Sequence, residues 1–161
     1  MLSQKDFIRL LNIEINLIKM QTEGLELEDA LIQPQPSGNC MNWVLGHLLE
    51  NQIEQLELLG AESPVERSLL TVYQRDSEPL VGECPEAWQL PELVAGLEEM
   101  HSALVARLGQ MSAADFEREV IYRDKSMTVG WRFLFNLFHY TYHLGQLEQL
   151  RQLAGRTEKL I

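Results

Sequence analysis

Four stretches of this 161-residue chain carry apolar side chains at the three- and four-residue spacing of an amphipathic α-helix. We predict helices over residues 3–21, 41–59 and 91–110, and a fourth that starts after Thr128 and ends near Gly155. A helix of about 20 residues is about 30 Å long. Four such helices joined by one long connection predict an all-α fold, a four-helix bundle of the antiparallel type with a long crossover between helices 2 and 3.

The ends of three of these helices carry local signals. Asn39 is placed to cap the second helix, and Gly60 is placed to end it. Pro91 suits the first turn of the third helix. Thr128 is a plausible N-cap for the fourth.

Two segments between the helices also suggest structure of their own. About thirty residues separate helices 2 and 3, which is too long for a bare loop in a compact domain. The sequence SPVE at residues 63–66 has a capping-box pattern and predicts a short helix there. Residues 118–127 (REVIYRDKSM) are expected to be extended and then to turn.

Length, charge and cysteine content limit the class of protein. The length predicts a single domain over residues 1–161. The formal net charge of -11 argues against binding to nucleic acid or to an anionic membrane surface. The sequence shows no signal peptide and no membrane span. Cys40 and Cys84 form no disulfide framework, so we expect two reduced thiols in a cytoplasmic protein.

A pair of histidines near the C-terminus suggests a metal site. His139 and His143 are four residues apart, so they lie on one face of the predicted helix. An HxxxH pair is a weak signal by itself, because buried histidines often have a structural role. The zinc-protease motif needs glutamate after the first histidine, and Tyr140 stands there instead.

A third histidine on another helix strengthens the metal interpretation. His47 lies midway along the second helix, in NWVLGHLLENQ. Three neutral imidazoles with an open fourth position are typical of a catalytic metal site and would suit Zn, Ni, Fe, Co or Mn. Gly46 and Gly145 lie next to these histidines, and each costs about 1 kcal/mol in a helix interior. We interpret them as points of close helix approach, although they could simply be tolerated.

Several other residues have both a functional and a structural interpretation. Glu14 is either a partner of a ligand histidine or part of a salt bridge at the rim. Asn51 and Glu54 follow His47 by one and two helical turns and could reach the metal pocket. His101 is a fourth ligand, an acid/base group or, as we favour, a partly buried structural residue. Five aromatic residues are expected in the core rather than on a substrate platform: Trp43, Trp131, Phe133, Phe135 and Phe138.

The chain resembles the DinB-like four-helix bundles, also called DinB/YfiT-like, over nearly its whole length, and two segments carry this resemblance. They are NWVLGHLLENQ (residues 42–52) and HYTYHLGQLEQLRQLAG (residues 139–155). In that family, histidines at the positions of His47, His139 and His143 bind a divalent metal. Some members are thiol-dependent transferases or isomerases, such as mycothiol-dependent maleylpyruvate isomerase and bacillithiol transferase, some resemble hydrolases, and many look like homodimers.

Two hypotheses for function follow from these residues. In the first, the protein is a metal-dependent enzyme that acts on a small molecule, as a thiol-dependent transferase or isomerase or as a hydrolase. A low-molecular-weight thiol would then be a cofactor, and its anionic groups would need cations supplied by Arg123, Lys125, Arg132 or Arg151. In the second, the metal only stabilises a structural, sensor or interaction protein. The resemblance implies a homodimer in either case.

Overall fold

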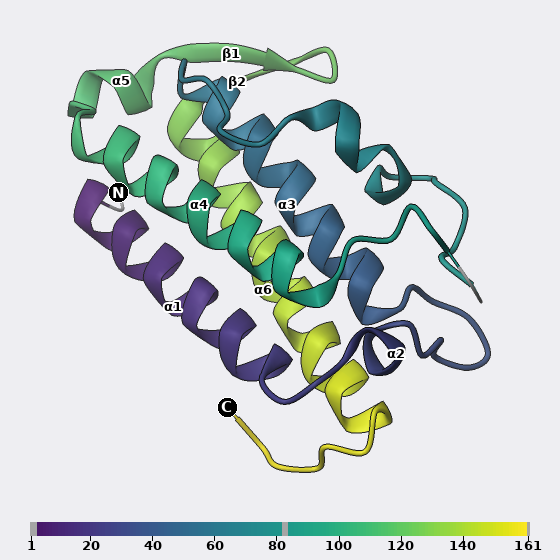
Figure 1. The fold of residues 1–161 in the computed structure, drawn as a ribbon. Helices are drawn as coiled ribbons and strands as arrows, with labels where there is room; N and C mark the ends of the chain where they lie inside the picture. Colours follow the sequence, from purple (N-terminus) through teal and green to yellow (C-terminus); the bar gives the residue numbers. More distant parts are fainter. Residues whose placement is uncertain (1–2, 82–83, 161) are drawn as a thin grey trace.

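The computed structural model describes residues 3–81 and 84–160. Its four long helices are α1 (Gln4–Thr22), α3 (Met41–Leu58), α4 (Leu90–Gly109) and α6 (Val129–Leu153) (Figure 1). The shorter elements are α2 (Leu27–Ala30), the 3₁₀ helix η1 (Arg67–Tyr73), α5 (Ala113–Glu117), and the strands β1 (Glu119–Tyr122) and β2 (Lys125–Thr128). The predicted all-α four-helix bundle is therefore confirmed. None of the helices in the described ranges combines the length and the apolar character needed to cross a membrane.

The four long helices form a bundle in which α4 and α6 each pack between α1 and α3. Figure 1 shows that α3 and α4 run in the same direction, and that α1 and α6 run in the opposite one. The expected antiparallel arrangement is therefore found for the pairs α1/α4 and α3/α6, and it is wrong for the neighbouring pairs α3/α4 and α1/α6. The reason is the long crossover, which carries the chain back along the bundle before α4 begins.

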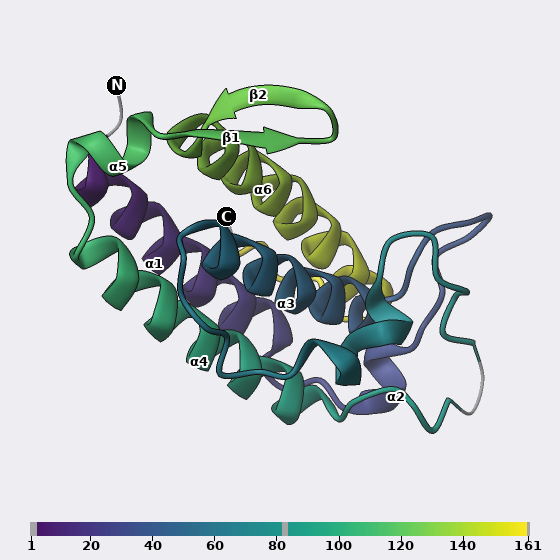
Figure 2. The ribbon, with the colours of Figure 1, turned by 90° about the horizontal axis from the view of Figure 1, so that it is seen from above.

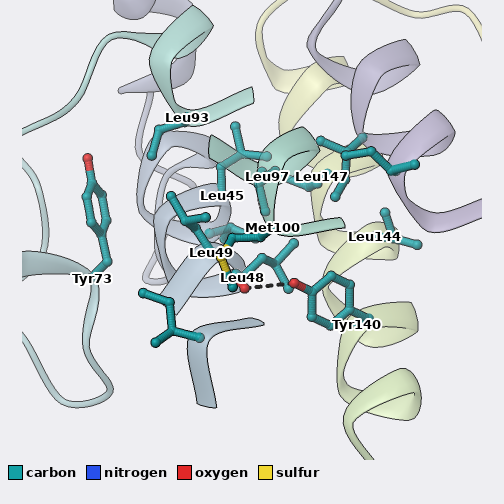
Figure 3. Packing of buried hydrophobic residues seen from close by; sticks show 14 of the residues in the cluster. Leu45, Leu48, Leu49, Tyr73, Leu93, Leu97, Met100, Tyr140, Leu144 and Leu147 are labelled. Atoms are coloured by element: carbon teal, nitrogen blue, oxygen red, sulfur yellow. Dashed lines mark hydrogen bonds between the residues drawn. The ribbon is translucent and has the colours of Figure 1, made fainter. Parts of the chain in front are cut away.

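Leucine side chains from α3, α4 and α6 fill the middle of the bundle (Figure 3). Leu45, Leu48 and Leu49 of α3 are fully buried. Tyr140 of α6 is also buried, and its hydroxyl donates a hydrogen bond of 2.7 Å to the backbone carbonyl of Leu48. This hydrogen bond and the apolar packing around it hold α6 against α3.

The helix ends agree with the sequence signals at two places and differ at a third. The Thr128 side chain accepts a hydrogen bond from the Trp131 backbone amide, as expected for an N-cap. Gly60 follows the last residues of α3 with φ +72°, a conformation that favours glycine. The predicted Asn39 cap is wrong, because Cys40 occupies the N-cap position of α3. Burial raises the pKa of the Cys40 thiol, which agrees with an inert thiol.

The short helix predicted at residues 63–66 is absent from this described segment, and η1 begins only at Arg67. The Ser63 hydroxyl accepts a hydrogen bond from the Val65 amide and donates one to the Val65 carbonyl. These bonds close a local turn instead of capping a helix, which is the usual competition between a serine side chain and helix formation.

Residues 118–127 fold largely as an antiparallel hairpin, in which Tyr122 pairs with Lys125 at the turn. Arg123 and Asp124 at the turn both have positive φ, as a two-residue hairpin loop requires. Strand β2 ends at Thr128 and leads directly into α6. Figure 2 shows the hairpin lying beside the N-terminal part of α6.

The crossover is fixed to α3 by Tyr73 of η1, which is fully buried. The Tyr73 hydroxyl donates to the Asn42 side chain and accepts from the Trp88 backbone amide. A Cβ atom at Gly46 would lie 2.2 Å from the Tyr73 ring. The close approach predicted at Gly46 is therefore present, but it involves the crossover and not a long helix. The same prediction for Gly145 is wrong, because a Cβ built there would meet no described atom within 4 Å beyond its chain neighbours and the nearby backbone of α6.

Aromatic residues divide between the core and the surface. Trp43 and Phe133 are buried, as predicted. Trp131, Phe135 and Phe138 are exposed, so the expectation that they belong to the core is wrong. They lie on the side of α6 that faces away from α1 and α3.

Glu14 of α1 is a buried carboxyl group in the core. Only 6% of the residue is exposed, and among the described residues its Oε2 atom has no hydrogen-bond partner. Burial raises the pKa of Glu14 to about 9, so the group is protonated at neutral pH. Both interpretations of Glu14 from the sequence, a salt bridge at the rim and a contact with a ligand histidine, are therefore wrong. The side chain is a neutral carboxyl group in the core.

We expect Gly46→Ala to destabilise the fold by about 1–3 kcal/mol, because the new methyl group would overlap the Tyr73 ring. Urea unfolding of the two proteins measures this difference. Gly109→Ala in α4 is the control, since its Cβ would meet no atom of the described chain within 4 Å. Equal stability of Gly46→Ala and wild type would show that Tyr73 does not hold the crossover in place.

We expect Glu14→Gln to make stability less dependent on pH. Between the ordinary pKa of 4.5 and the folded pKa of about 9, the folded state keeps a proton that the unfolded state has released. Wild-type stability therefore falls as the pH rises through this range, by on the order of 3 kcal/mol at pH 7.

Urea unfolding of wild type and Glu14→Gln at pH 5, 7 and 9 tests this expectation. The advantage of the variant should be small at pH 5 and should grow toward pH 9. Subtracting the two proteins at each pH cancels the titration of every other group. A difference that stays constant with pH would mean that Glu14 is ionised in the folded protein.

Candidate metal centre

Three histidines from two helices meet at one place. His47 is on α3, and His139 and His143 are one turn apart on α6. One ring nitrogen from each of the three lies within 4.8 Å of the others. The ring centroids of His139 and His143 are 4.4 Å apart, and that of His47 lies 5.4 and 5.3 Å from them. The structure thus brings together all three ligands predicted from the sequence.

Hydrogen bonds orient two of the three rings. The Nδ1 atom of His47 lies 3.0 Å from the Tyr73 carbonyl oxygen, which can only accept a hydrogen bond. Nδ1 of His143 lies 2.6 Å from Oε1 of Gln146. Each Nδ1 therefore carries the proton, and each Nε2 keeps its lone pair for a ligand. Trp43 stacks on the His47 ring at a centroid distance of 4.7 Å and restricts its rotation.

All three imidazoles are neutral at pH 7. Burial, and to a smaller extent the nearby His47 and Arg132, lower the pKa of His139 to about 4. Burial, followed by the neighbouring His139, lowers the pKa of His143 to about 4 as well. The pKa of His47 is lowered mainly by burial as well. Neutral imidazole is the form that binds a metal ion.

The geometry of the α6 pair is suited to a shared cation. Nε2 of His139 and Nε2 of His143 are only 2.9 Å apart. Two lone pairs at that distance repel each other unless a proton or a metal ion lies between them. Imidazole nitrogens bind zinc at about 2.0–2.1 Å, so a small adjustment of the rings would accommodate an ion. This set of three nitrogen donors, from the buried His47 and His143 and the half-buried His139, could hold a divalent metal ion.

A surface pocket of about 370 Å³ opens beside two of the histidines, His47 and His139. Asn51 and Glu54 line it, as the sequence suggested. The Asn51 amide donates to the His47 carbonyl at 2.8 Å and lies 3.2 Å from Nε2 of His47. The remaining lining residues come from α3, the crossover, the hairpin and α6: Glu50, Arg75, Tyr122, Arg123, Arg132, Phe135 and Asn136.

The buried guanidinium of Arg132 forms one wall of this pocket. It pairs with Glu54 at 3.0 Å, bonds the Asn136 side chain, and stacks over the Tyr122 ring at 3.9 Å. The other acidic group of the pocket, Glu50, is 3.6 Å from Arg67. Both carboxylates of the pocket are thus close to an arginine.

Two arginines of the pocket keep their charge available to a ligand. Within residues 3–81 and 84–160, the one ion pair of Arg75 is with the exposed Asp76, at 3.8 Å. Arg123 forms no ion pair in the described part of the chain, and its guanidinium lies 5.2 Å from the centre of the Tyr122 ring. Reasoning from the sequence named Arg123 but missed Arg75 and Tyr73, because the crossover has no periodic pattern that would place them.

Other candidates from the sequence lie elsewhere. Arg151 is buried and donates hydrogen bonds to the carbonyls of Gln21 and Glu23, so it ties α6 to the end of α1. Lys125 is exposed on the hairpin and is not among the residues that line the pocket. His101 is on α4 and is not part of the three-histidine cluster found among the described residues.

Comparisons with known proteins agree with this architecture. The model of the DinB superfamily matches residues 16–147. A crystal structure of a conserved protein from Enterococcus faecalis is similar, with a TM-score of 0.74 and 17% sequence identity over 96% of this chain and 98% of that chain. At that identity the likeness concerns the fold. No curated protein matches the sequence. Because the family model covers most of the chain, including all three histidines, the protein belongs to the DinB superfamily.

Proposed function

We propose that this protein is a metal-dependent enzyme that acts on a small anionic molecule. The observation that carries the proposal is that two histidines of the triad, His47 and His139, line a pocket at the protein surface. A structural metal site is closed by its protein ligands, whereas a catalytic one keeps a position for water or substrate. Three protein donors beside an accessible pocket match the catalytic type.

The charge of the pocket supports an anionic ligand. Glu54 is neutralised by Arg132, and Glu50 lies near Arg67. Arg75 and Arg123 then remain at the pocket without a strong partner in the described chain. An arginine matches a carboxylate or phosphate group through two parallel hydrogen bonds. The protein as a whole carries a net charge of -11, which repels anions. Arg75 and Arg123 provide local positive charge that attracts an anion to the pocket.

The surrounding residues would hold the histidine rings and Arg132 in their orientations while a ligand binds. The Tyr73 carbonyl and the Gln146 side chain hold the protons of His47 and His143 on Nδ1. Glu54, Asn136 and the Tyr122 ring restrain Arg132. Arg123 is at the hairpin turn and Arg75 follows η1. The substrate would therefore bind to arginines from two different segments of the chain.

A divalent ion such as Zn, Ni, Fe, Co or Mn would supply Lewis acidity, which lowers the pKa of a bound water or thiol. A thiol nucleophile would make the protein a transferase or isomerase that uses a low-molecular-weight thiol. A water nucleophile would make it a hydrolase. In both reactions Arg75 and Arg123 would orient an electrophilic substrate through its negative group.

We expect protein purified without a histidine tag to contain one divalent ion per chain, and we expect His139→Ala to lose it. The reason is that two nitrogen donors in this geometry bind a metal much more weakly than three. Elemental analysis by mass spectrometry measures the content. His101→Ala is the matched control, because it removes a histidine from α4 outside the cluster.

Wild type without metal, even after dialysis against Zn, Ni and Mn, would overturn the metal site. A second result bears on catalysis alone. If the metal is present and its removal lowers the melting temperature, yet no small thiol or anion reaches it, the metal only clamps α3 to α6. That outcome would favour a structural role for the site.

We expect Arg123→Gln to weaken binding of an anionic ligand, with Lys125→Gln as the control on the same hairpin. Cobalt(II)-loaded protein is titrated with 3-mercaptopropionate and with 3-mercaptopropan-1-ol, which differ only in the carboxylate. Thiol binding is read from the visible absorption of cobalt. Wild type should bind the carboxylate about tenfold more tightly, as expected for a charge-assisted hydrogen bond.

The preference should shrink toward equality in Arg123→Gln and stay unchanged in Lys125→Gln. Equal binding of the two thiols by wild type would contradict the role of the arginines while leaving an accessible metal. No spectral change with either thiol would contradict the open metal position itself.

A further inference from the structure

Glu50 is a half-buried carboxyl group in the wall of the histidine pocket, and its side chain is 18% exposed. It follows His47 by three residues on α3, so the two side chains lie on the same face of the helix. The Cβ atoms of such a pair are about 5–6 Å apart. Glu50 therefore borders the space in which a ligand would meet His47 and His139.

The two carboxylates of the pocket are held in different ways. The buried Arg132 lies 3.0 Å from Glu54. Arg67 lies 3.6 Å from Glu50, which is too far for a hydrogen bond, and it is closer to Glu57, at 3.1 Å. The Nε atom of Arg67, which faces Glu50 at this distance, has no hydrogen-bond partner in the described part of the chain. Arg67 thus offsets part of the charge of Glu50 without forming a hydrogen bond to it through Nε.

The surroundings of Glu50 also make it a stronger base than an ordinary glutamate. Burial raises the pKa of Glu50, Arg67 opposes this rise, and the neighbouring Glu54 and Glu57 add to it. A base with a higher pKa accepts a proton more readily. The other charged or titratable groups around the pocket come from α3, the crossover, the hairpin and α6: His47, Arg75, Tyr122, Arg123, Arg132 and His139.

These other groups of the described pocket are less suited to accept a proton. Arginine stays protonated in proteins, so the three arginines can only donate hydrogen bonds. His47 and His139 need their lone pairs for the metal ion. A phenol such as Tyr122 donates a proton rather than accepting one at neutral pH. The remaining carboxylate, Glu54, is held by Arg132 at the shorter distance.

Both reactions of the proposed function need a proton acceptor in the pocket. A thiol attacks an electrophile as the thiolate, and water attacks as hydroxide. A free cysteine thiol has a pKa of about 8.5, so at pH 7 a similar thiol reaches the pocket with its proton. A group that accepts this proton must lie within hydrogen-bond reach of the nucleophile, directly or through one water molecule.

We propose that Glu50 is the general base of the histidine pocket and accepts the proton of the thiol or water nucleophile on its carboxylate. This inference rests on the proposed function, since the same pocket must admit the nucleophile. The S–H or O–H bond breaks, its electron pair stays on sulfur or oxygen, and a new O–H bond forms on Glu50. The negative charge moves from Glu50 to the nucleophile, so the total charge of the pocket stays the same.

Counting the protons released when a thiol binds tests this role. Cobalt(II)-loaded protein is titrated with 3-mercaptopropan-1-ol in a calorimeter at pH 7, in buffers that differ in their ionisation enthalpy. The dependence of the binding heat on the buffer gives the number of protons released per thiol. Wild type should release almost none, because Glu50 keeps the proton. Glu50→Gln should release about one, because the amide cannot accept it.

Two further variants separate proton transfer from the structural contact with Arg67. Glu50→Asp keeps a carboxylate, so it should release almost no proton, as in wild type. Glu57→Gln removes the closer partner of Arg67, and Glu57 is not among the described residues that line the histidine pocket. This variant should therefore also behave like wild type. Circular dichroism confirms that each variant is folded.

The pH dependence of thiol affinity gives a second measurement. The visible absorption of cobalt reports the affinity for 3-mercaptopropan-1-ol at pH 6.5 and at pH 7.5. Binding to Glu50→Gln should become about tenfold tighter over this range, because it releases one proton to the solvent. Binding to wild type should change little, because the proton stays in the pocket.

The possible outcomes distinguish the role of Glu50 from the proposed function. Release of about one proton by wild type would overturn the role of Glu50, and so would equal release by wild type and Glu50→Gln. Thiol binding in either case would still support an open metal position. Proton release by Glu57→Gln that matches Glu50→Gln would assign the effect to the Arg67 contact and would also overturn the role of Glu50. Unchanged cobalt absorption in wild type would overturn both the base and the proposed function.

Discussion

The contact between α3 and α6 sets the distance between His47 and the pair His139 and His143. The Tyr140 hydroxyl donates a hydrogen bond to the Leu48 carbonyl. Tyr140 directly follows His139 in the chain, and Leu48 directly follows His47. Apolar packing of α3 leucines against α6 excludes water from the same region. This contact therefore places three nitrogen donors together and also lowers their pKa values, since burial is the main cause of each shift.

The two long connections complete the site that the helices begin. The crossover contributes the Tyr73 carbonyl that orients His47, and it contributes Arg75 two residues later. The hairpin contributes Arg123 and the Tyr122 ring that stacks on Arg132. Helices supply the donors that need rigid spacing, and the connections supply the charged groups that face the solvent. This division is common in enzymes, whose binding residues often lie on loops held by a rigid scaffold.

The two sides of α6 have different properties for a physical reason. The inner side carries Tyr140 and His143 and is buried against α1 and α3. The outer side carries exposed aromatic residues and no charge. A helix at the edge of a bundle normally places charged residues toward water. The outer side of α6 reverses that rule, on a chain with a net charge of -11.

The sequence by itself determined the four helices, the Thr128 cap and the three histidines, because helical periodicity and the spacing of His139 and His143 are local properties. It could not determine which connection reaches which helix. Gly46 gave a correct signal of close packing, but only the tertiary structure identified Tyr73 as its neighbour. Periodicity also cannot distinguish an inner apolar face from an outer one, so it predicts core positions for Phe135 and Phe138, which the structure leaves exposed. Arg75 and the neutral Glu14 depend on contacts and burial from distant parts of the chain, which only the fold decides.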